Sequence, residues 1–342
     1  MNTEERKIFW DALCKADGKD IKTDGQSIAA TIHYPRFLYR YRPVSVSSID
    51  ALQTNHLFFS MANYYDDPFD TMIKIDYSVL HQHIMQMLSS EEIFQQLGLM
   101  CKFLNVSEEG RLAAESIIKA VPPEEIVKGV DDFFRNNIQS VLKESLWTVC
   151  FSESGINETM WLKYADQYKG FCVVYDFIDE KRKLCGKQEK CVNCVVNNAG
   201  VSLYPVYYSD TGYDATEYAR NLTVATIVRS KVPMLAERII QSLPHASWEQ
   251  ERIALIKSKC HEYDQEWRMI LRSPANGPIM QEWVPYGIVL GLRTNSRDKS
   301  TIIRSAKLAG IDHFLQPIST ILIVWILDHY KRITSSVFSA SQ

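Results

Sequence analysis

Arginine and tyrosine residues alternate along the segment YPRFLYRYRP, which covers residues 34–43. Arg40 and Arg42 share one side of the expected strand and Tyr39 and Tyr41 share the other, because successive strand residues point in opposite directions. A guanidinium pairs with a phosphate through two parallel hydrogen bonds, and a tyrosine ring stacks on a base or a nicotinamide ring. The pattern suits a dinucleotide, and it equally suits an ordinary strand whose arginines face solvent or an acidic partner.

A glutamate and an arginine stand two residues apart in the segment EWRMIL, which begins at Glu266. The segment has the pattern of a strand, so Glu266 and Arg268 lie on one face of it. A carboxylate beside apolar neighbours has a tunable charge state and can stabilise an oxocarbenium ion at a ribose carbon. The same spacing also predicts an ion pair, either between Glu266 and Arg268 or between Glu266 and a neighbouring strand.

Three aromatic residues fall at spacings of three and four in MWLKYADQYKG, namely Trp161, Tyr164 and Tyr168. This spacing places them on one face of a helix that we expect to run up to Gly170, with Asp166 on another face. Aromatic residues on one helical face belong more often to a core than to a site. Trp161 and Tyr164 are still candidates for the wall of a binding site.

Acidic residues cluster around a proline in the segment DDPFD, which begins at Asp66. Adjacent carboxylates on a turn, here Asp67 and Asp70 among them, can bind Mg²⁺ or Ca²⁺. Aspartates at such positions also cap backbone amides before a proline. Both interpretations stay open from the sequence.

The cysteines do not complete a metal site. The chain has eight of them, and Cys191-x-x-Cys194 with Cys185 upstream is the closest approach to a zinc motif. Zinc needs four ligands, and the nearest further candidates, Cys260 and His261, lie far along the chain. We therefore predict that Cys191 and Cys194 are free thiols without a bound metal.

Periodic hydrophobic patterns predict the elements that carry these residues. Strands are expected at residues 37–42, 56–60, 146–152, 170–177, 203–209, 266–272, 287–292 and 320–327. A helix at residues 3–16 with Thr3 as its N-cap and a loop at 17–27 make up an N-terminal part, residues 1–30. Pro205 predicts an edge position for the strand that contains it.

The order of these elements predicts an α+β fold with a central mixed or antiparallel sheet. Residues 31–342 form its single domain, and helical insertions are expected at about 77–145 and 214–258. The segment 180–198 is polar and is expected to form a loop. We expect the strands that contain Tyr41, Val173 and Arg268 to belong to one sheet, with the helical blocks outside it.

Composition limits the class of protein. The 342 residues include 38 basic and 41 acidic side chains, a net charge of −3, so general attraction to nucleic acid is not expected. The longest strongly apolar run, residues 321–327, is too short to span a bilayer. The first ten residues, MNTEERKIFW, are charged and have no apolar stretch of a secretory signal. We expect a cytoplasmic protein without a membrane partner.

Four segments follow one another in an order that resembles a known bacterial family. They are LYRYRP with LFFSMANYYDDPFD, then VCFSESGINETMWLKYADQYKGFCVVYDF, then YPVYYSD, then the pair YDQEWRMIL and GIVLGL. Their aromatic, acidic and glycine landmarks are similar to those of the family named domain of unknown function 2971. The resemblance covers roughly residues 37–292 and implies no established reaction. It favours a structural or substrate-positioning role for Asp67.

The opening layout, a strand with a basic residue beside Tyr, a helix, and a strand that ends in Phe-Ser, is similar to the opening of ADP-ribosyltransferases. In that fold a first-strand His or Arg holds NAD, a middle segment supplies a Tyr or Ser, and a late strand supplies a Glu. The resemblance implies Arg40 for the first, Tyr164 or Ser60 for the second and Glu266 for the third.

The same resemblance implies roles for the other candidates. Arg40 and Tyr41 would hold NAD, and Tyr164 would flank nicotinamide. Ser60, Trp161 and Arg268 are the further cofactor-binding candidates. The chain departs from the family in having the helix MWLKYAD at the middle position and Asp-Gln-Glu where arginine-modifying members carry Glu-x-Glu. The acceptor is therefore left open.

Three hypotheses about function follow. The leading one is an NAD-using, ADP-ribosyltransferase-like enzyme that modifies a macromolecule or cleaves NAD, in a setting such as a toxin or anti-phage defence. The second is a metal-dependent nuclease or phosphodiesterase built on Asp67, Asp70, Asp166 and Glu266. The third is a non-catalytic sensor or interaction protein whose helical blocks bind a partner.

Overall fold

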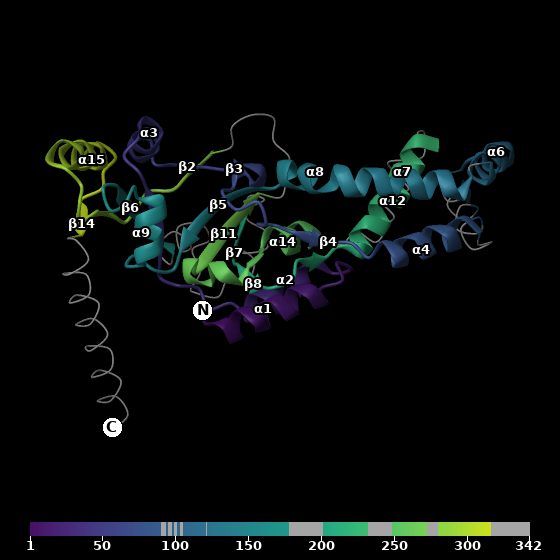
Figure 1. Ribbon diagram of the computed structural model, residues 1–342, viewed down its shortest axis with the longest axis horizontal. Coiled ribbons are helices and arrows are strands. Elements are labelled where there is room, and N and C mark those ends of the chain that lie inside the picture. Colours follow the sequence, from purple (N-terminus) through teal and green to yellow (C-terminus); the bar gives the residue numbers. More distant parts are fainter. Residues whose placement is uncertain are drawn as a thin grey trace, which may run out of the picture.

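A central sheet organises the part of the chain that the structure describes. The computed structural model describes residues 1–89, 94, 98, 101–102, 105–120, 122–177, 201–231, 248–271 and 280–315. Within these residues eight strands form one sheet in the order β14-β13-β6-β1-β5-β11-β7, with β3 paired to β5 (Figure 1). The strands are β1 (Phe37–Arg42), β3 (Ser60–Met61), β5 (Trp147–Ser152), β6 (Phe171–Asp176), β7 (Val201–Pro205), β11 (Glu266–Leu271), β13 (Gly287–Leu290) and β14 (His313–Leu315).

The sheet is mixed, in agreement with the predicted α+β class. β13 and β14 run parallel, whereas β1, β5, β6, β7, β11 and β3 pair in antiparallel fashion. The strands that contain Tyr41, Val173 and Arg268 all belong to it, which confirms the prediction. The strand expected at 203–209 is instead two strands: β7 ends at Pro205, and residues 207–209 pair with a different segment outside this sheet. β7 is the last of the described strands in the order, in agreement with the edge position predicted from Pro205.

Both faces of the sheet carry apolar clusters. All residues of β6 are buried, as its run of β-branched and aromatic residues favours. In β1, Leu38 belongs to the main hydrophobic cluster and Tyr41 to a smaller one that also contains Trp161 and Val174. Because Leu38 and Tyr41 point to opposite sides of the strand, β1 is covered by side chains on both faces.

β1 and β5 separate after a short contact. β1 pairs with β6 over its whole length, from Phe37 opposite Asp176 to Arg42 opposite Phe171. On its other side, β1 pairs with β5 only at Tyr39, opposite Ser152. The backbone of β1 beyond Tyr39 therefore has no neighbouring strand on the β5 side among the described residues.

Helices and three small strand pairs surround the sheet. The helices are α1 (Thr3–Lys15), α2 (Ile21–Ala30), α3 (Val46–Gln53), α4 (Tyr77–Ser89), α6 (Glu108–Lys119), α7 (Pro123–Asn136), α8 (Ile138–Ser145), α9 (Glu158–Tyr164), α12 (Thr216–Lys231), α14 (Glu249–Ala254), α15 (Ser296–Leu308) and the 3-10 turns η1 (Ala62–Tyr64) and η2 (Lys259–Asp264). The small pairs are β2 (His56–Phe58) with β12 (Met280–Glu282), β4 (Ile73–Lys74) with β9 (Tyr213–Asp214), and β8 (Tyr207–Ser209) with β10 (Ile256–Ser258).

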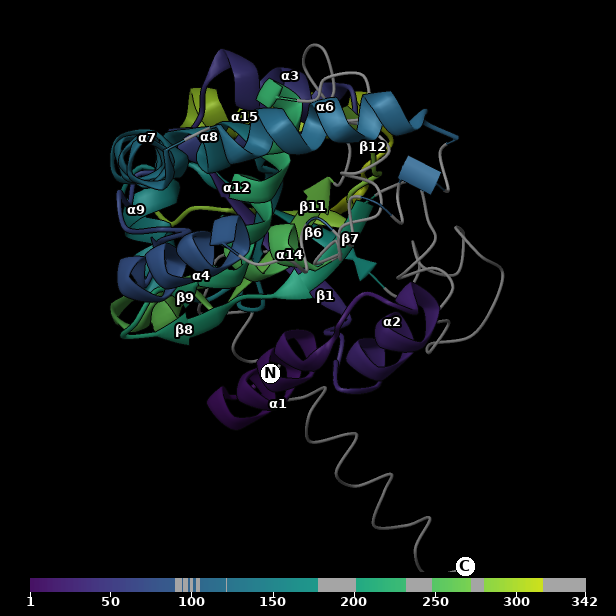
Figure 2. The same ribbon diagram turned by 90° about the vertical axis from the view of Figure 1, so that its right-hand side faces the viewer.

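The expected helical insertions lie outside the central sheet. α4, α6, α7 and α12 extend together to one side of it in Figure 1, and Figure 2 shows α7 and α8 on the side opposite α1 and α2. The second insertion was expected to be helical up to residue 258, and this is wrong at its end. Ile256–Ser258 forms β10 beside β8, because this parallel pairing with a distant segment outweighs the local pattern.

The N-terminal part differs from the prediction in two details. Asn2, and not Thr3, caps α1, and its side chain accepts the Glu5 amide while the Glu5 carboxylate accepts the Asn2 amide. Within the expected loop 17–27, α2 begins at Ile21 after its cap Asp20. Asp20 accepts two amides at the first turn of α2, and buried Ile28 fixes the helix on the main hydrophobic cluster.

Several predictions fall on other parts of the chain. The expected loop 180–198 with Cys191 and Cys194, and the expected strand 320–327, lie outside the described residues. The described cysteines, Cys14, Cys101, Cys150, Cys172 and Cys260, are free thiols. Across the described helices, none combines the length and apolar character that crossing a membrane requires.

Candidate functional site

A cleft of about 810 Å³ opens where β1 and β5 separate. β1 lines it with Tyr39 to Arg42, and β5 lines it with Cys150 to Ser152. The remaining walls come from Ser60 and the segment 64–70, from α9, and from residues between 257 and 268, which run from β10 through η2 into β11. Its volume lies in the range of small-molecule and cofactor sites.

Most residues predicted from the sequence lie in this cleft. Those that line it are Arg40, Tyr41, Ser60, Tyr164, Glu266 and Arg268. Trp161 does not line it. The Trp161 side chain is fully buried behind the cleft, where its indole N–H donates to the Gly155 carbonyl at 3.0 Å. Its ring meets the Tyr41 ring edge-on, with 5.2 Å between centroids, so Trp161 supports the wall from the core.

Tyr41 and Tyr164 offer different groups to a ligand. The Tyr41 hydroxyl donates to the Ser154 carbonyl at 2.6 Å and accepts the Asn157 amide at 3.3 Å, so it joins β1 to the start of α9. Tyr164 is half-buried, and its hydroxyl has no hydrogen-bond partner among the described residues. Burial raises the pKa of Tyr164, so this hydroxyl stays protonated and can donate.

The turn after α9 differs from the predicted helix end. α9 ends at Tyr164 instead of continuing to Gly170, and residues 166–168 have φ angles of 45°, 53° and 69°. A β-carbon at Gly170 would lie 2.1 Å from the Arg42 carbonyl oxygen. Glycine at this position lets the turn approach β1 closely, beside the cleft residue Arg42.

Glu266 lies at the base of the cleft between two buried cations. One carboxylate oxygen accepts from Arg268 Nε at 2.7 Å, and the other accepts from Lys257 Nζ at 2.7 Å. Arg268 also donates to both Asp70 oxygens, at 2.8 and 2.6 Å, and to the Ala254 carbonyl. The ion pair expected between Glu266 and Arg268 is therefore present, and Lys257 provides a second one.

The charges of this network hold each other ionised. Burial alone would raise the pKa of Glu266, but Arg268 and Lys257 outweigh burial, and the pKa of Glu266 falls below its ordinary value of 4.5. Burial alone would lower the pKa of Lys257, but Glu266 and Asp70 outweigh it, and that pKa is raised. Glu266 is a carboxylate and Lys257 is an ammonium throughout the neutral range.

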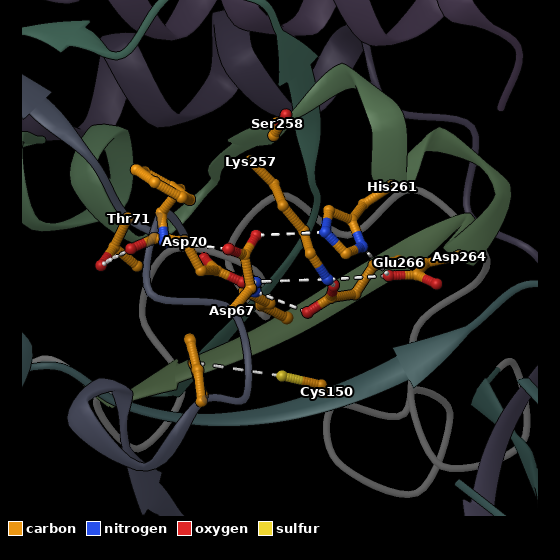
Figure 3. Close-up of polar contacts among 12 residues, drawn as sticks. Asp67, Asp70, Thr71, Cys150, Lys257, Ser258, His261, Asp264 and Glu266 are labelled. Atoms are coloured by element: carbon orange, nitrogen blue, oxygen red, sulfur yellow. Dashed lines mark hydrogen bonds and ion pairs between the residues drawn. The ribbon is translucent and has the colours of Figure 1, made fainter. Parts of the chain in front are cut away.

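A second acidic pair lies beside this network (Figure 3). Lys257 extends from β10 among the carboxylates and donates to Asp264 Oδ2 at 2.8 Å. His261 lies between Asp67 and Asp264, with Nε2 3.2 Å from Asp67 Oδ2 and Nδ1 3.7 Å from Asp264 Oδ2. Neither contact has the geometry of a hydrogen bond, and Asp67 Oδ2 and Asp264 Oδ1 are buried acceptors without a hydrogen-bond donor.

The two arginines of β1, Arg40 and Arg42, are cations that lack an acidic partner among the described residues. Arg40 Nη1 is buried and has no hydrogen-bond acceptor, and neither Arg40 nor Arg42 forms an ion pair with a described residue. Burial, and then the charge of Arg42, lowers the pKa of Arg40 to about 9, so it is still protonated at neutral pH. The Arg40 side chain is half-buried, and a partly buried cation without a described partner costs free energy, so an anionic ligand would relieve that cost.

The thiol of Cys150 is not a nucleophile in this setting. Cys150 lines the cleft from β5, 4.0 Å from the Tyr65 hydroxyl. Burial, followed by the charge of Glu266, raises the pKa of Cys150 to about 12. The thiol is therefore protonated at neutral pH, and the reactive thiolate is scarce.

Sequence reasoning missed Lys257, and gave no role to His261 and Asp264 at this site. These residues come from β10 and η2, which lie on the stretch whose first part was expected to be a helix. The signal available in the sequence was the spacing of Asp264 and Glu266, two acidic residues with one residue between them. In the structure that middle residue, Gln265, has a left-handed backbone with φ of 46°. No local pattern indicates that Lys257 reaches both of these carboxylates.

The structure brings only some of the acidic residues of the nuclease hypothesis into one cleft. Asp67, Asp70 and Glu266 line the cleft, and Asp166 does not. Asp70 and Glu266 each form ion pairs with Arg268 and Lys257. Within the described ranges no group of three or more His, Cys, Asp or Glu residues is arranged to hold a metal ion.

Comparison with known proteins does not identify a family for this chain. No family model, no curated protein and no solved structure matched the chain. The two family resemblances thus stay predictions.

Proposed function

We propose that the cleft binds an anionic nucleotide, with NAD as the candidate, and that the protein is an ADP-ribosyltransferase-like enzyme. One observation carries the proposal. Arg40 presents a buried guanidinium nitrogen without an acceptor in a cleft that also contains tyrosine rings and an ionised glutamate. Phosphate oxygens supply the missing acceptors and the missing negative charge. Arg42 beside Arg40 suits the two charges of a pyrophosphate.

Glu266 and Tyr164 would act at the other end of the ligand. As nicotinamide leaves the ribose carbon, positive charge develops there, and the fixed carboxylate of Glu266 would stabilise it. Arg268 and Lys257 hold that carboxylate in one place, so it needs no reorganisation during the reaction. The Tyr164 hydroxyl, which has no described partner, would donate to the nicotinamide amide or to a ribose oxygen. Nicotinamide would leave with the electron pair of the broken carbon–nitrogen bond, and water or an acceptor group would then bond to the ribose carbon and lose a proton to solvent.

Nicotinamide release from NAD tests the proposal. Purified wild-type protein should release nicotinamide, and mass spectrometry should find free ADP-ribose or a mass increase on an added macromolecule. Glu266→Gln should reduce release by about 100-fold or more while NAD still binds, because the carboxylate acts mainly in the transition state. Arg40→Ala should weaken NAD binding more than it slows the chemical step.

Arg36→Ala is the matched control, because Arg36 pairs with Asp176 and does not line the cleft. This variant should keep NAD binding and release within about twofold, as surface changes usually do. Circular dichroism must show that each variant is folded, since Glu266 contributes two buried ion pairs. Wild-type protein that neither binds NAD nor releases nicotinamide contradicts the proposal, and so does full activity in Glu266→Gln.

A further inference from the structure

Two large aromatic side chains stand unpacked at the cleft. Tyr64 is 71% exposed and Phe69 is 62% exposed, and both line the cleft. They lie on the segment between β3 and β4, which also supplies Asp66 and Asp67 to the same cleft. Aromatic side chains that stay in contact with water do not gain the stabilisation that burial gives, and a ligand bound in the cleft would bury them. We therefore treat Tyr64 and Phe69 as candidate ligand contacts.

The residues between and beside them hold the segment in place. Tyr65 points inward, where the Arg268 guanidinium lies over its ring at 4.9 Å and its hydroxyl bonds the Thr148 hydroxyl. The Phe69 amide donates to Asp67 Oδ1 at 2.9 Å.

Asp70 fixes the end of the segment. Its two oxygens accept from Arg268, and Asp70 is 2% exposed. The next amide, that of Thr71, donates to the Ile256 carbonyl at 3.3 Å. The backbone that carries Tyr64 and Phe69 is therefore bonded to β11 through Asp70 and to β10 through Thr71. This fixation lowers the entropy cost of binding a planar ring against the two side chains.

We propose that Tyr64 and Phe69 form the stacking surface for the planar ring of the nucleotide whose phosphates Arg40 and Arg42 bind. This inference rests on the proposed function and names the subsite for the base. A planar ring fits the observations because the same cleft holds Arg40 and Arg42, which form no ion pair with a described residue and are available to phosphate, and aromatic rings stack on any base. A protein partner would instead need a broad surface whose centre is depleted of charge, whereas the same segment also brings the carboxylates of Asp66 and Asp67 to this cleft.

Binding of ADP and of inorganic pyrophosphate, measured by titration calorimetry, tests the inference. Both probes carry two phosphates, and only ADP carries a ring. The wild-type protein should bind ADP at least tenfold more tightly than pyrophosphate. Tyr64→Ala and Phe69→Ala should each weaken ADP binding by about fivefold to tenfold and leave pyrophosphate binding within about twofold, as expected for loss of base stacking. Phe69→Trp should retain ADP binding.

Leu308→Ala is the matched control, because Leu308 is 71% exposed and lies on α15 outside the cleft. It should change neither affinity. Equal losses of ADP and pyrophosphate binding in the alanine variants, or no loss of ADP binding while Arg40→Ala abolishes it, would overturn the stacking subsite and leave the proposed function standing. Wild-type protein that binds neither probe nor NAD would overturn both.

Discussion

Arg40 is half-buried and forms no ion pair with any residue that the structure describes. Its Nη1 is buried without an acceptor, and its pKa is lowered to about 9 from the ordinary 12.5. Since both the folded and the unfolded chain hold this proton below pH 9, the full cost of the partly buried cation is present at neutral pH and declines only as pH rises above 9. The free protein therefore carries a penalty that a bound anion would remove.

Arg40→Met should accordingly stabilise the ligand-free protein. We expect a gain of about 1–2 kcal/mol in the free energy of unfolding, because the long apolar side chain keeps the packing and removes the charge. The same variant should lose anion binding. Urea unfolding and calorimetric titration measure the two effects. Arg36→Met, which removes the exposed partner of Asp176, should give no gain. Equal or lower stability of Arg40→Met would contradict the assignment of Arg40 as an unpaired cation.

Acid should weaken the fold partly through Glu266. Its folded-state pKa is below the ordinary 4.5, so its carboxylate stabilises the fold above pH 4.5 and this contribution is lost as pH falls below that value. Glu266→Gln should be less stable than wild type by about 1–3 kcal/mol at neutral pH. Unfolding by urea between about pH 3 and pH 6 should show the difference shrinking as pH falls. A difference that is constant across this range would show that Glu266 is not held ionised.

At the scale of elements, the close contact between β1 and the turn before β6 depends on Gly170. An alanine β-carbon there would lie 2.1 Å from the Arg42 carbonyl oxygen, which backbone atoms cannot move aside cheaply. Gly170→Ala should lower the free energy of unfolding by about 3 kcal/mol or more. Gly129→Ala is the control, since Gly129 lies in α7 with nothing within 4 Å of the added carbon. It should stabilise by about 0.5–1 kcal/mol, and similar losses in both variants would refute the steric argument.

Local patterns predicted the strands well because their residues match their surroundings. The segment at Phe37–Arg42 alternates as a strand does, and Phe171–Asp176 is rich in the residues that a buried strand favours. α2 was missed because Gly25 and the polar residues around it have weak helix propensity. Its cap Asp20 and the burial of Ile28 decide its structure, and the second of these depends on residues far along the chain.

The site was predictable only where one strand carried its own signal. Arg40 and Glu266 stand on strands with clear alternation, and both line the cleft. Lys257 stands on a three-residue strand whose partner is β8, so its position depends on a pairing across a helical insertion. Trp161 has the residue type of a site wall, and only the packing of α9 against β1 shows that it lies behind the wall.

At the scale of the whole molecule, the first helix reaches the backbone of the catalytic candidate. Arg6 is 3% exposed and donates to the carbonyls of Val206 and Glu266 at 2.7 and 2.9 Å. Phe9 and Leu13 of the same helix belong to the main hydrophobic cluster. The N-terminal part therefore shares a core with the sheet and supports β11 at its first residue.

Arg6→Met should destabilise the whole molecule, because it removes the buried Arg6 donor from the Val206 carbonyl, one of the two donors to the Glu266 carbonyl, and the ion pair between Arg6 and Glu153. We expect a loss of about 3 kcal/mol, with a single transition in thermal unfolding followed by near- and far-ultraviolet circular dichroism. Lys7→Met changes the neighbouring residue, whose side chain is 52% exposed, and should stay within about 0.5 kcal/mol of wild type. Melting of α1 in a separate, earlier transition would contradict the shared core.

The early separation of β1 from β5 has a consequence for amide hydrogen exchange. Beyond Tyr39, amides of residues 40–42 that point away from β6 have no described strand to bond, although β1 lies in the middle of the sheet. In the free protein these amides should exchange with deuterium much faster than those of β6, because exchange requires an unbonded amide that water can reach. A ligand that fills the cleft should slow them, so exchange at β1 would report occupancy for any compound, whether or not it is turned over.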